Sequence, residues 1–416
     1  MRKGIELPDA ELLDLVQRQT FRYFWDFAHP VSGLARDRGE RDATSGGDVI
    51  SIGGSGFGVM ALIVGVERGW ITREEGLARL LTITGFLEKA TCYHGMFPHF
   101  LNGTTGQTIP FSRKDDGSDL VETAYLIAGL LCARQYFAGD GAEEKLLRGR
   151  IDWLWREVEW DWHTRGGLNV LFWHWSPNSG WSTEHEVRGW SECLIAYVLA
   201  VSAPRYPIRP DVYHRGWAEA RHFLNRRPYY GIELPLGPDF GGPLFFAHYS
   251  FLGLDPHGLK DRYADYWEQN VRHSLINYEH CVRNPNGFAG YGPDCWGLTS
   301  SDNDHGYVDH SPTNDRGVIS PSAALSSMPY TPEHSLRALR YFHGELGSKL
   351  WGQYGFADAF NPTTGWVAGT HLAIDQGPIV IMIENYRTGL LWRLFMSCPE
   401  IRDGLRRLDF TSPHLS

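Results

Sequence analysis

Helical segments of two alternating kinds run through the chain, and this alternation constrains the fold more than any other feature. Charged segments with apolar residues three and four positions apart, such as residues 8–28 and 72–90, are typical of helices with one face in solvent. Segments rich in Gly, Ala and aliphatic residues, such as 55–70 and 118–137, are expected to be buried all round. The pattern continues at 141–160, 191–203, 210–225, 243–254, 259–282, 321–329, 331–346 and 375–395.

These segments form six consecutive pairs, each with a charged helix followed by an apolar one. We therefore predict an all-α fold, an (α/α)6 barrel of six outer–inner helical hairpins. Clear strand periodicity is missing from the sequence, apart from short stretches such as 166–175. Because no long linker or low-complexity segment interrupts the pattern, we expect a single domain over residues 1–416.

Composition narrows the range of partners and compartments. The net charge of -10 argues against nucleic acid and against anionic membrane surfaces, since both require a clustered basic footprint. No apolar run reaches about 18 residues, so we expect no transmembrane helix. The six cysteines show no CxxC spacing and are expected to be reduced. We expect a cytoplasmic protein if Met1 is the native start, and a periplasmic or secreted one if a leader was removed.

Long polar loops precede several of the predicted inner helices, at residues 99–117, 163–189 and 284–320. Loops longer than about 15 residues usually carry function. Because each leads from an outer helix into an inner one, all are expected at the same end of the barrel. The chain contains 16 Trp, 19 Tyr and 21 Phe, more than core filling usually requires. The aromatic residues expected to line the common mouth include Trp173, Trp175, Trp181, Tyr291 and Trp296.

Acidic residues mark the starts of the predicted inner helices. They are Asp115, Asp119 and Glu122 before and in one helix, Glu192 in the next, and Asp375 in the last. Each also has a purely structural interpretation, because carboxylates cap helix N-termini and complement the helix dipole. Capping does not explain why wide aromatic loops converge on the same end. A negative, aromatic-lined cavity suits a neutral, hydroxyl-rich substrate, and two carboxyl groups across a cleft can hydrolyse a glycoside.

A helix N-terminus lowers the pKa of a carboxyl group, whereas a general acid needs it raised. Glu192, beside Trp190 and before an apolar helix, is therefore the better candidate for the acid. Arg36 and Asp37, after the first helix, form either a structural salt bridge or part of the site.

Two motifs that resemble ligand sites are set aside. Residues 53–58, GGSGFG, lack the preceding strand of a dinucleotide-binding unit. Residues 301–310, SDNDHGYVDH, lack the glycine and terminal glutamate spacing of an EF-hand. We therefore expect no cofactor and no metal.

Five segments together carry a resemblance to a known family. They are FRYFWDFAHPVSGLARDR (21–38), DDGSDLVETAYLIAGLL (115–131), GWSECLIAYVLA (189–200), HYSFLGLDP (248–256) and AIDQGPIVIMIENYRTGLLW (373–392). The chain resembles the bacterial glucoamylase-like domain, and most of all the endo-β-1,2-glucanases of glycoside hydrolase family 144. The resemblance spans nearly the whole sequence. Its motifs are specific to the family and less specific to one activity within it.

The resemblance implies an (α/α)6 barrel that cleaves β-1,2-linked glucose chains with inversion. It implies that Glu192 is the general acid and Asp375 the general base. Asp115, Asp119 and Glu122 fall on the family's other candidate carboxylates, and we expect them to bind sugar hydroxyls. We accordingly expect an inverting endo-β-1,2-glucanase whose partner is a β-glucan or gluco-oligosaccharide. An exo-acting sophorose-releasing enzyme, a glucanotransferase and a non-catalytic glucan-binding protein remain alternatives.

Overall fold

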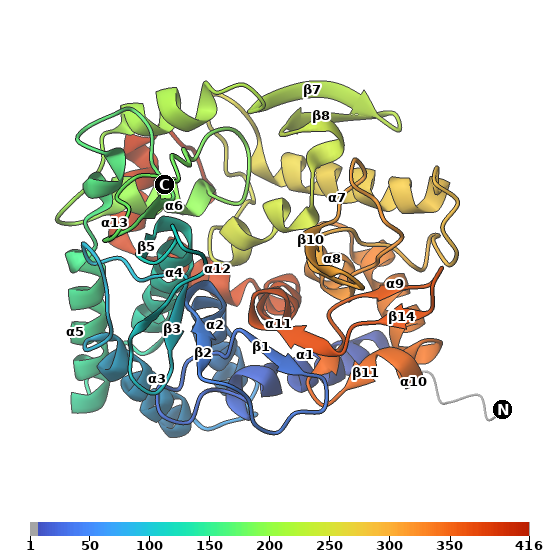
Figure 1. Cartoon of the computed structure of the whole chain (residues 1–416), viewed down its shortest axis with the longest axis horizontal. Coiled ribbons are helices and arrows are strands. Elements are labelled where there is room, and N and C mark those ends of the chain that lie inside the picture. The colour runs from blue at the N-terminus through green and yellow to red at the C-terminus, as the bar shows by residue number, and fades with distance from the viewer. Residues whose placement is uncertain (1–6, 416) are drawn as a thin grey trace.

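Inner segments close into a ring in the computed structural model, which describes residues 7–415. The helix α2 (Ile52–Glu67) packs on α4 (Leu120–Tyr136), and α4 packs on α6 (Leu194–Ser202). The helix α11 (Ala373–Thr388) contacts α8 (Pro321–Ser326) and closes the ring against α2. Figure 1 shows α11 nearly end-on near the middle of the molecule.

Outer helices pack around this ring and alternate with the inner ones along the chain. They are α1 (Asp9–Trp25), α3 (Arg73–Leu87), α5 (Ala142–Glu157), α7 (Tyr266–Arg283) and α9 (Pro332–Gly344). Helix α5 buries one side only, whereas α2 buries each of its first fourteen residues. This difference is what the charged and apolar sequence patterns predicted. The predicted helical barrel is confirmed.

The fourth predicted hairpin departs from regular helix in both halves. In place of an outer helix over 210–225, a short π-helical segment covers Val212–Ala218. In place of an inner helix over 243–254, two 3-10 turns cover Leu244–Ala247 and Tyr249–Leu252. The chain reaches the first turn through Gly241 and Gly242, both at positive φ, and then through Pro243, whose side chain cannot cap a helix.

The last predicted helix is also divided. Gly389 adopts φ +67° and ends α11, so that α12 (Leu390–Met396) starts in a new direction. A further helix that the sequence analysis did not predict, α13 (Pro399–Arg407), packs on α6. The short α10 (Gly347–Leu350) follows α9.

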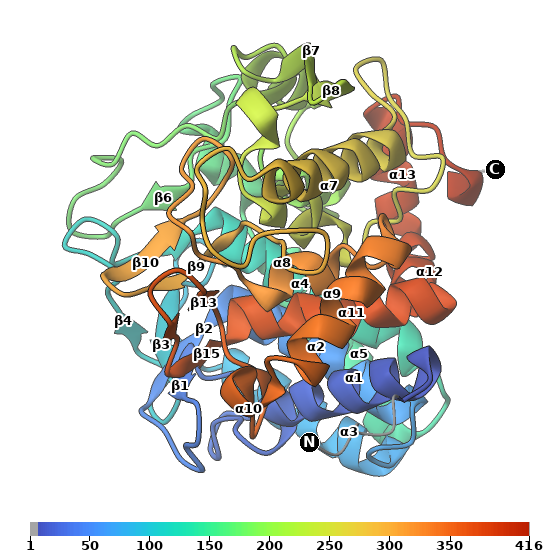
Figure 2. The ribbon, with the colours of Figure 1, turned by 90° about the vertical axis from the view of Figure 1, so that its right-hand side faces the viewer.

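Short antiparallel strands gather at one end of the barrel, where long loops were expected apart from the strand-like stretch 166–175 that contains β6 (Figure 2). Three of them, β2, β5 and β15, run directly into the inner helices α2, α4 and α11. The pairs at this end are β1 (Arg38–Glu40) with β15 (Thr370–Leu372), β2 (Val49–Ser51) with β3 (Phe100–Asn102) and β4 (Thr108–Ile109), β5 (Ser118–Asp119) with β6 (His174–Trp175), and β9 (Ser300–Asn303) with β10 (Gly306–Asp309). The remaining pairs are β7 (Leu224–Tyr229) with β8 (Ile232–Leu236), β11 (Trp351–Gly352) with β12 (Gly355–Phe356), and β13 (Phe360–Asn361) with β14 (Trp366–Val367).

The hydrophobic core has one large cluster along α2, α4 and α6 and a second around α8 and α9. The six cysteines are unpaired, and all but Cys92 are buried. Across residues 7–415, no helix is both long and apolar enough to cross a membrane.

Two glycines allow α2 and α4 to cross at backbone contact. A Cβ atom at Gly129 of α4 would overlap the carbonyl oxygen of Gly56, and one at Gly56 would overlap the carbonyl oxygen of Tyr125. Because both obstacles are backbone atoms in packed helices, neither can move aside without shifting a ring helix. This contact fixes the distance between the two helices that begin at the barrel mouth.

We predict that Gly129→Ala lowers the free energy of unfolding by about 2 kcal/mol or more, because overpacking a rigid contact forces backbone shifts. Urea unfolding measures this change. The matched control is Gly149→Ala on the exposed side of α5, where a Cβ meets nothing within 4 Å. This control should be neutral or stabilising by about 0.5–1 kcal/mol. Equal effects of the two substitutions would contradict the close-contact interpretation.

Candidate active site

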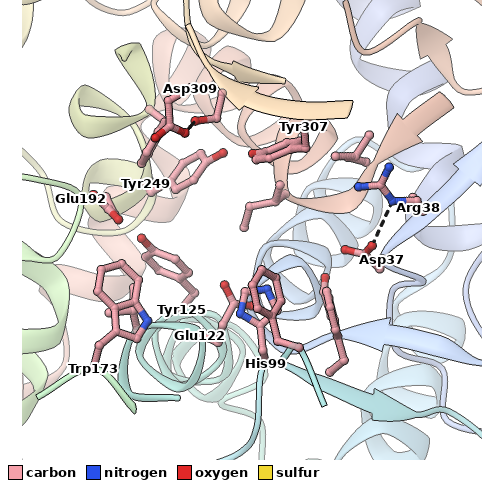
Figure 3. Close-up of a pocket in the computed structure, with 18 residues that line it drawn as sticks. Asp37, Arg38, His99, Glu122, Tyr125, Trp173, Glu192, Tyr249, Tyr307 and Asp309 are labelled. Carbon is pink, nitrogen blue, oxygen red and sulfur yellow. Dashed lines mark hydrogen bonds and ion pairs between the residues drawn. The ribbon is translucent and has the colours of Figure 1, made fainter. Parts of the chain in front are cut away.

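A cavity of about 520 Å³ opens at the end of the barrel where the strands gather. Four acidic residues contribute to its wall: Asp37 before β1, Glu122 in α4, Glu192 before α6 and Asp309 at the end of β10. Its aromatic residues are Phe100, Phe111, Tyr125, Trp173, Phe245, Tyr249 and Tyr307. Figure 3 shows Glu192 on one side of this space and the Asp37–Arg38 pair on the other.

Glu192 lies in the wall of the cavity, two residues before α6 begins. Burial raises the pKa of its carboxyl group to about 7, and the nearby carboxylate of Asp309 contributes in the same direction. The preceding Trp190 is buried against Trp217 and Tyr266, which makes an apolar surround. The local backbone is fixed by Ser250, whose hydroxyl donates to the carbonyl oxygen of Glu192. Glu192 can therefore remain protonated near neutral pH.

Asp119 is fully buried and organises the start of α4. Its Oδ1 accepts hydrogen bonds from the backbone N–H groups of Val121 and Glu122, both at 3.0 Å, as a helix N-cap. The same oxygen accepts from the indole Nε1–H of Trp173 at 3.0 Å, and Oδ2 contacts the ring of His99 at 3.1 Å. One carboxylate thus caps a helix and orients two side chains that line the cavity.

His99 supplies positive charge among these acids. Burial alone would lower its pKa, but the carboxylates of Glu122, Asp119 and Asp115 outweigh burial and raise the pKa from 6.5 to about 10. Burial raises the pKa of Glu122 to about 7 despite the opposing effect of His99. Oε2 of Glu122 accepts the backbone N–H of Gly53 at 2.6 Å. The acids at the start of α4 are therefore partly compensated by an imidazolium ion.

Asp115 lies beside Asp119 and shares a neighbour with it. The Nδ1 atom of His174 is 3.3 Å from Asp115 Oδ1 and 3.7 Å from Asp119 Oδ2, as ion-pair contacts. Ligand atoms of these three residues lie within 4.8 Å of one another, which is a spacing that a metal ion could use. However, the oxygens of Asp119 already serve the helix cap, Trp173 and His99. The three residues therefore form an ion-paired group where β5 pairs with β6.

Asp375 does not line the cavity but lies behind its wall. Its carboxyl group is 2% exposed, and Oδ1 accepts a 3.3 Å hydrogen bond from the hydroxyl of Tyr249, whose ring lines the cavity. Burial, together with the neighbouring Asp358, raises the pKa of Asp375 well above its usual range. The sequence analysis expected Glu192 and Asp375 to face one hollow, whereas the structure connects Asp375 to it through Tyr249.

Of the five aromatic residues expected at the mouth, Trp173 lines the cavity. Trp175, the second residue of β6, contacts Trp162 and His94, and Trp181 contacts Trp162 and Phe172. Residues two apart in a strand share a face, so strand alternation does not separate Trp175 from Trp173, and the cavity lining includes only Trp173 of the two.

The other two expected aromatic residues pack into the protein instead. The hydroxyl of Tyr291 donates to Asp315 at 2.7 Å. Trp296 is fully buried against Tyr278, and its indole N–H donates to the carbonyl oxygen of His334 at 3.2 Å. The loop 284–320 folds back onto α7 and α9, so these rings extend the second core cluster.

Several residues that line the cavity were missed by the sequence analysis or given another interpretation. Asp37 was weighed as the partner of Arg36, but it pairs with Arg38, while Arg36 donates to backbone carbonyl oxygens. Tyr307 and Asp309 lie in the long loop 284–320 that was expected at the mouth, but neither was singled out as a site residue. The other aromatic lining residues that were missed are His99, Phe100, Phe111, Tyr125, Phe245 and Tyr249, and the remaining missed residues are Arg38, Ser51, Val121, Ser300, Leu372 and Ile374. Membership of a long loop was the available signal for His99 and Phe111, because both lie in 99–117.

A helical double ring with a cavity of carboxyl and aromatic groups at one end defines the class of glucoamylase-like barrel proteins. The family model for Glycoamylase, described as putative glucoamylase, matches residues 184–399, and the chain belongs to this family.

Relatives with known structures cover nearly the whole chain. A putative glucoamylase from Bacteroides uniformis is 60% identical with a TM-score of 0.97, covering 99% of this chain and 100% of that one. An endo-β-1,2-glucanase from Chitinophaga pinensis, in complex with sophorotriose and glucose, is 54% identical with a TM-score of 0.95, covering 98% and 100%.

A curated relative from Parabacteroides distasonis is an exo β-1,2-glucooligosaccharide sophorohydrolase acting at the non-reducing end. It is 47% identical over 97% of this chain, and the chain spans 58% of its length. The resemblance identified from the sequence is therefore confirmed at the level of the family.

Because the pKa of His99 is raised, the free energy of unfolding should depend on pH in a way that tests whether His99 carries a positive charge. The pKa of His99 is about 10 in the folded state and 6.5 in the unfolded state. The imidazolium therefore stabilises the fold fully below pH 6.5. This stabilisation is lost as the pH rises through about 10. We predict that the free energy of unfolding declines more steeply between these values in the wild type than in His99→Gln, measured by urea unfolding at a series of pH values.

The exposed His305 provides the control, and His305→Gln should follow the wild-type curve. Parallel curves for wild type and His99→Gln would contradict an imidazolium at this position.

Proposed function

We propose that residues 1–416 form a single catalytic domain that hydrolyses β-1,2-linked glucose chains as an inverting endo-β-1,2-glucanase. One observation carries the proposal: Glu192 is a buried carboxyl group with a pKa of about 7 in the wall of an aromatic cavity. Relatives that act on β-1,2-linked glucose chains, at 47% and 54% identity, support the choice of substrate.

The proposed role of Glu192 is that of general acid. As the bond between the anomeric carbon and the glycosidic oxygen breaks, the Glu192 proton passes to the leaving oxygen. A water molecule adds to the opposite face of the sugar ring, so the anomeric configuration inverts. Its proton passes to the general base, which we propose to be Asp375, acting through the Tyr249 hydroxyl that joins it to the cavity.

The rest of the cavity would hold the sugar chain. Sugar rings stack their C–H faces on aromatic side chains, and the tilted pair of Phe100 and Phe111, with centroids 5.7 Å apart, offers such a surface at the rim. The Phe111 side chain is 57% exposed, so its ring face is free to contact a sugar ring. Asp115, Asp119 and Glu122 would act by setting the positions and charge of His99, His174 and Trp173.

Product length separates endo from exo action, and the exo-acting relative at 47% identity makes this comparison necessary. We predict that early digestion of linear β-1,2-glucan yields a spread of oligosaccharides, resolved by chromatography over time. Accumulation of sophorose alone would favour the exo alternative, and chains longer than the substrate would favour a glucanotransferase. Glucan binding with no new reducing ends would indicate a binding protein. Matched digestion of other linear β-glucans tests the linkage.

We predict that Glu192→Gln lowers kcat on β-1,2-glucan by about 10²–10⁴-fold, because the amide cannot supply the proton. The wild-type rate should also decline as the pH rises above about 7, where Glu192 loses its proton. Initial rates of reducing-end release measure both effects. The matched control is Glu11→Gln in α1, which should retain wild-type activity. Near-normal turnover by Glu192→Gln would transfer the acid role to another residue.

A further inference from the structure

Asp358 and Asp375 form a buried pair of carboxyl groups behind the cavity. Each is 2% exposed, and Asp358 is close enough for its charge to raise the pKa of Asp375. Oδ1 of Asp358 and Oδ2 of Asp375 are buried and have no hydrogen-bond partner among the residues described. The mechanism proposed above uses Asp375 and gives no role to Asp358.

Two carboxylates cannot both be charged in such a position. Neither has a salt-bridge partner of its own within residues 7–415, and unpaired buried charge is strongly unfavourable. When two carboxyl groups share one buried site, they hold a proton between them and titrate as a unit. Such a proton also satisfies the two oxygens that otherwise lack partners.

The groups around the pair are placed to localise its single negative charge. Oδ2 of Asp358 accepts the backbone N–H of Asp302 at 2.7 Å, which stabilises charge on Asp358. The guanidinium of Arg38, 3.3 Å from the Asp302 carboxylate, adds positive potential on that side. Asp375 receives only the longer bond from Tyr249, at 3.3 Å, and its other titratable neighbours are Tyr307 and Asp302. Burial raises the pKa of Asp358 to about 7 and raises the pKa of Asp375 well above its usual range, and the Asp302 carboxylate contributes in the same direction to both.

We infer that Asp358 is a positioning residue for the reaction: it carries the negative charge of a one-proton pair with Asp375, and Tyr249 connects this pair to the cavity. The inference rests on the proposed function, since it assigns the base to the pair and not to Asp375 alone. It also explains how a carboxyl group that does not line the cavity can accept a proton from it.

The proton transfer balances along this chain of groups. The attacking water gives one proton to the Tyr249 oxygen as its remaining O–H bonds to the anomeric carbon. The Tyr249 proton passes to Asp375 Oδ1, and the proton already on Asp375 Oδ2 passes to Asp358 Oδ1. The pair becomes neutral, while Glu192 becomes a carboxylate after protonating the leaving oxygen. Solvent then returns one proton from the pair to Glu192.

Infrared difference spectroscopy of the wild-type protein tests the shared proton without any activity assay. At about pH 9, Glu122 and Glu192 are ionised, and we expect one buried protonated carboxyl band to remain. Asp375→Asn should abolish this band, Asp358→Asn should make it titrate at lower pH, and the exposed control Asp304→Asn should leave it unchanged. Lack of a protonated carboxyl in the wild type at this pH would overturn the inference, even if the variants fail to fold.

The pH profile of glucan hydrolysis tests the positioning role. The acidic limb of kcat reports the protonation of the singly charged pair to its neutral form. In Asp358→Asn no second carboxyl shares the proton or accepts the N–H of Asp302, so we expect this limb to move up by about one pH unit or more. A purely structural role would lower the rate at every pH without moving the limb, and that outcome would overturn the inference. If the wild type hydrolyses no glucan but shows the band and its shift, the proposed function fails while the shared proton stands.

Discussion

The buried carboxylate of Asp119 is the interaction on which the barrel mouth depends. It holds the first turn of α4, the indole of Trp173 and the ring of His99 together, and so connects an inner helix to β6 and to the loop before β3. A neutral side chain in its place would leave buried donors without partners and remove one of the carboxylates that raise the pKa of His99. Asp119 therefore caps α4 and positions cavity side chains at the same time. The helix-capping and functional-site interpretations of this acid do not exclude each other.

The acids in and behind the cavity wall differ in how far neighbouring donors and cations stabilise their negative charge. Asp119 is surrounded by donors, and these lower its pKa although burial opposes them. Glu192 lacks a cationic partner in the described structure, and burial raises its pKa to about 7. The same kind of side chain thus stays ionised at one helix start and holds a proton at another. The helix dipole alone would have lowered the pKa at both positions, so desolvation decides the outcome at Glu192.

The sequence predicted the helical barrel because its signal is repeated and local: each helix buries one face or all of its surface, and composition records which. It did not predict the irregular segments at 212–218 and 244–252, where glycines and tight packing override apolar periodicity. Glu122, Glu192 and Trp173 lie in the wall of one cavity, as expected when helix starts converge at one end of a barrel. Tyr291 and Trp296 lie elsewhere, because the direction in which a long loop folds back depends on contacts far away in the chain.

The two 3-10 turns at Leu244–Ala247 and Tyr249–Leu252 occupy the place of an inner helix and contribute Phe245 and Tyr249 to the cavity. A regular helix there would pack on its neighbours with the same periodicity as α2 and α4. Inserting or deleting one residue in it would rotate every side chain that follows. Successive turns have no such periodicity. This sector of the ring is accordingly where insertions or deletions could reshape the pocket between homologues while the other helices keep their register.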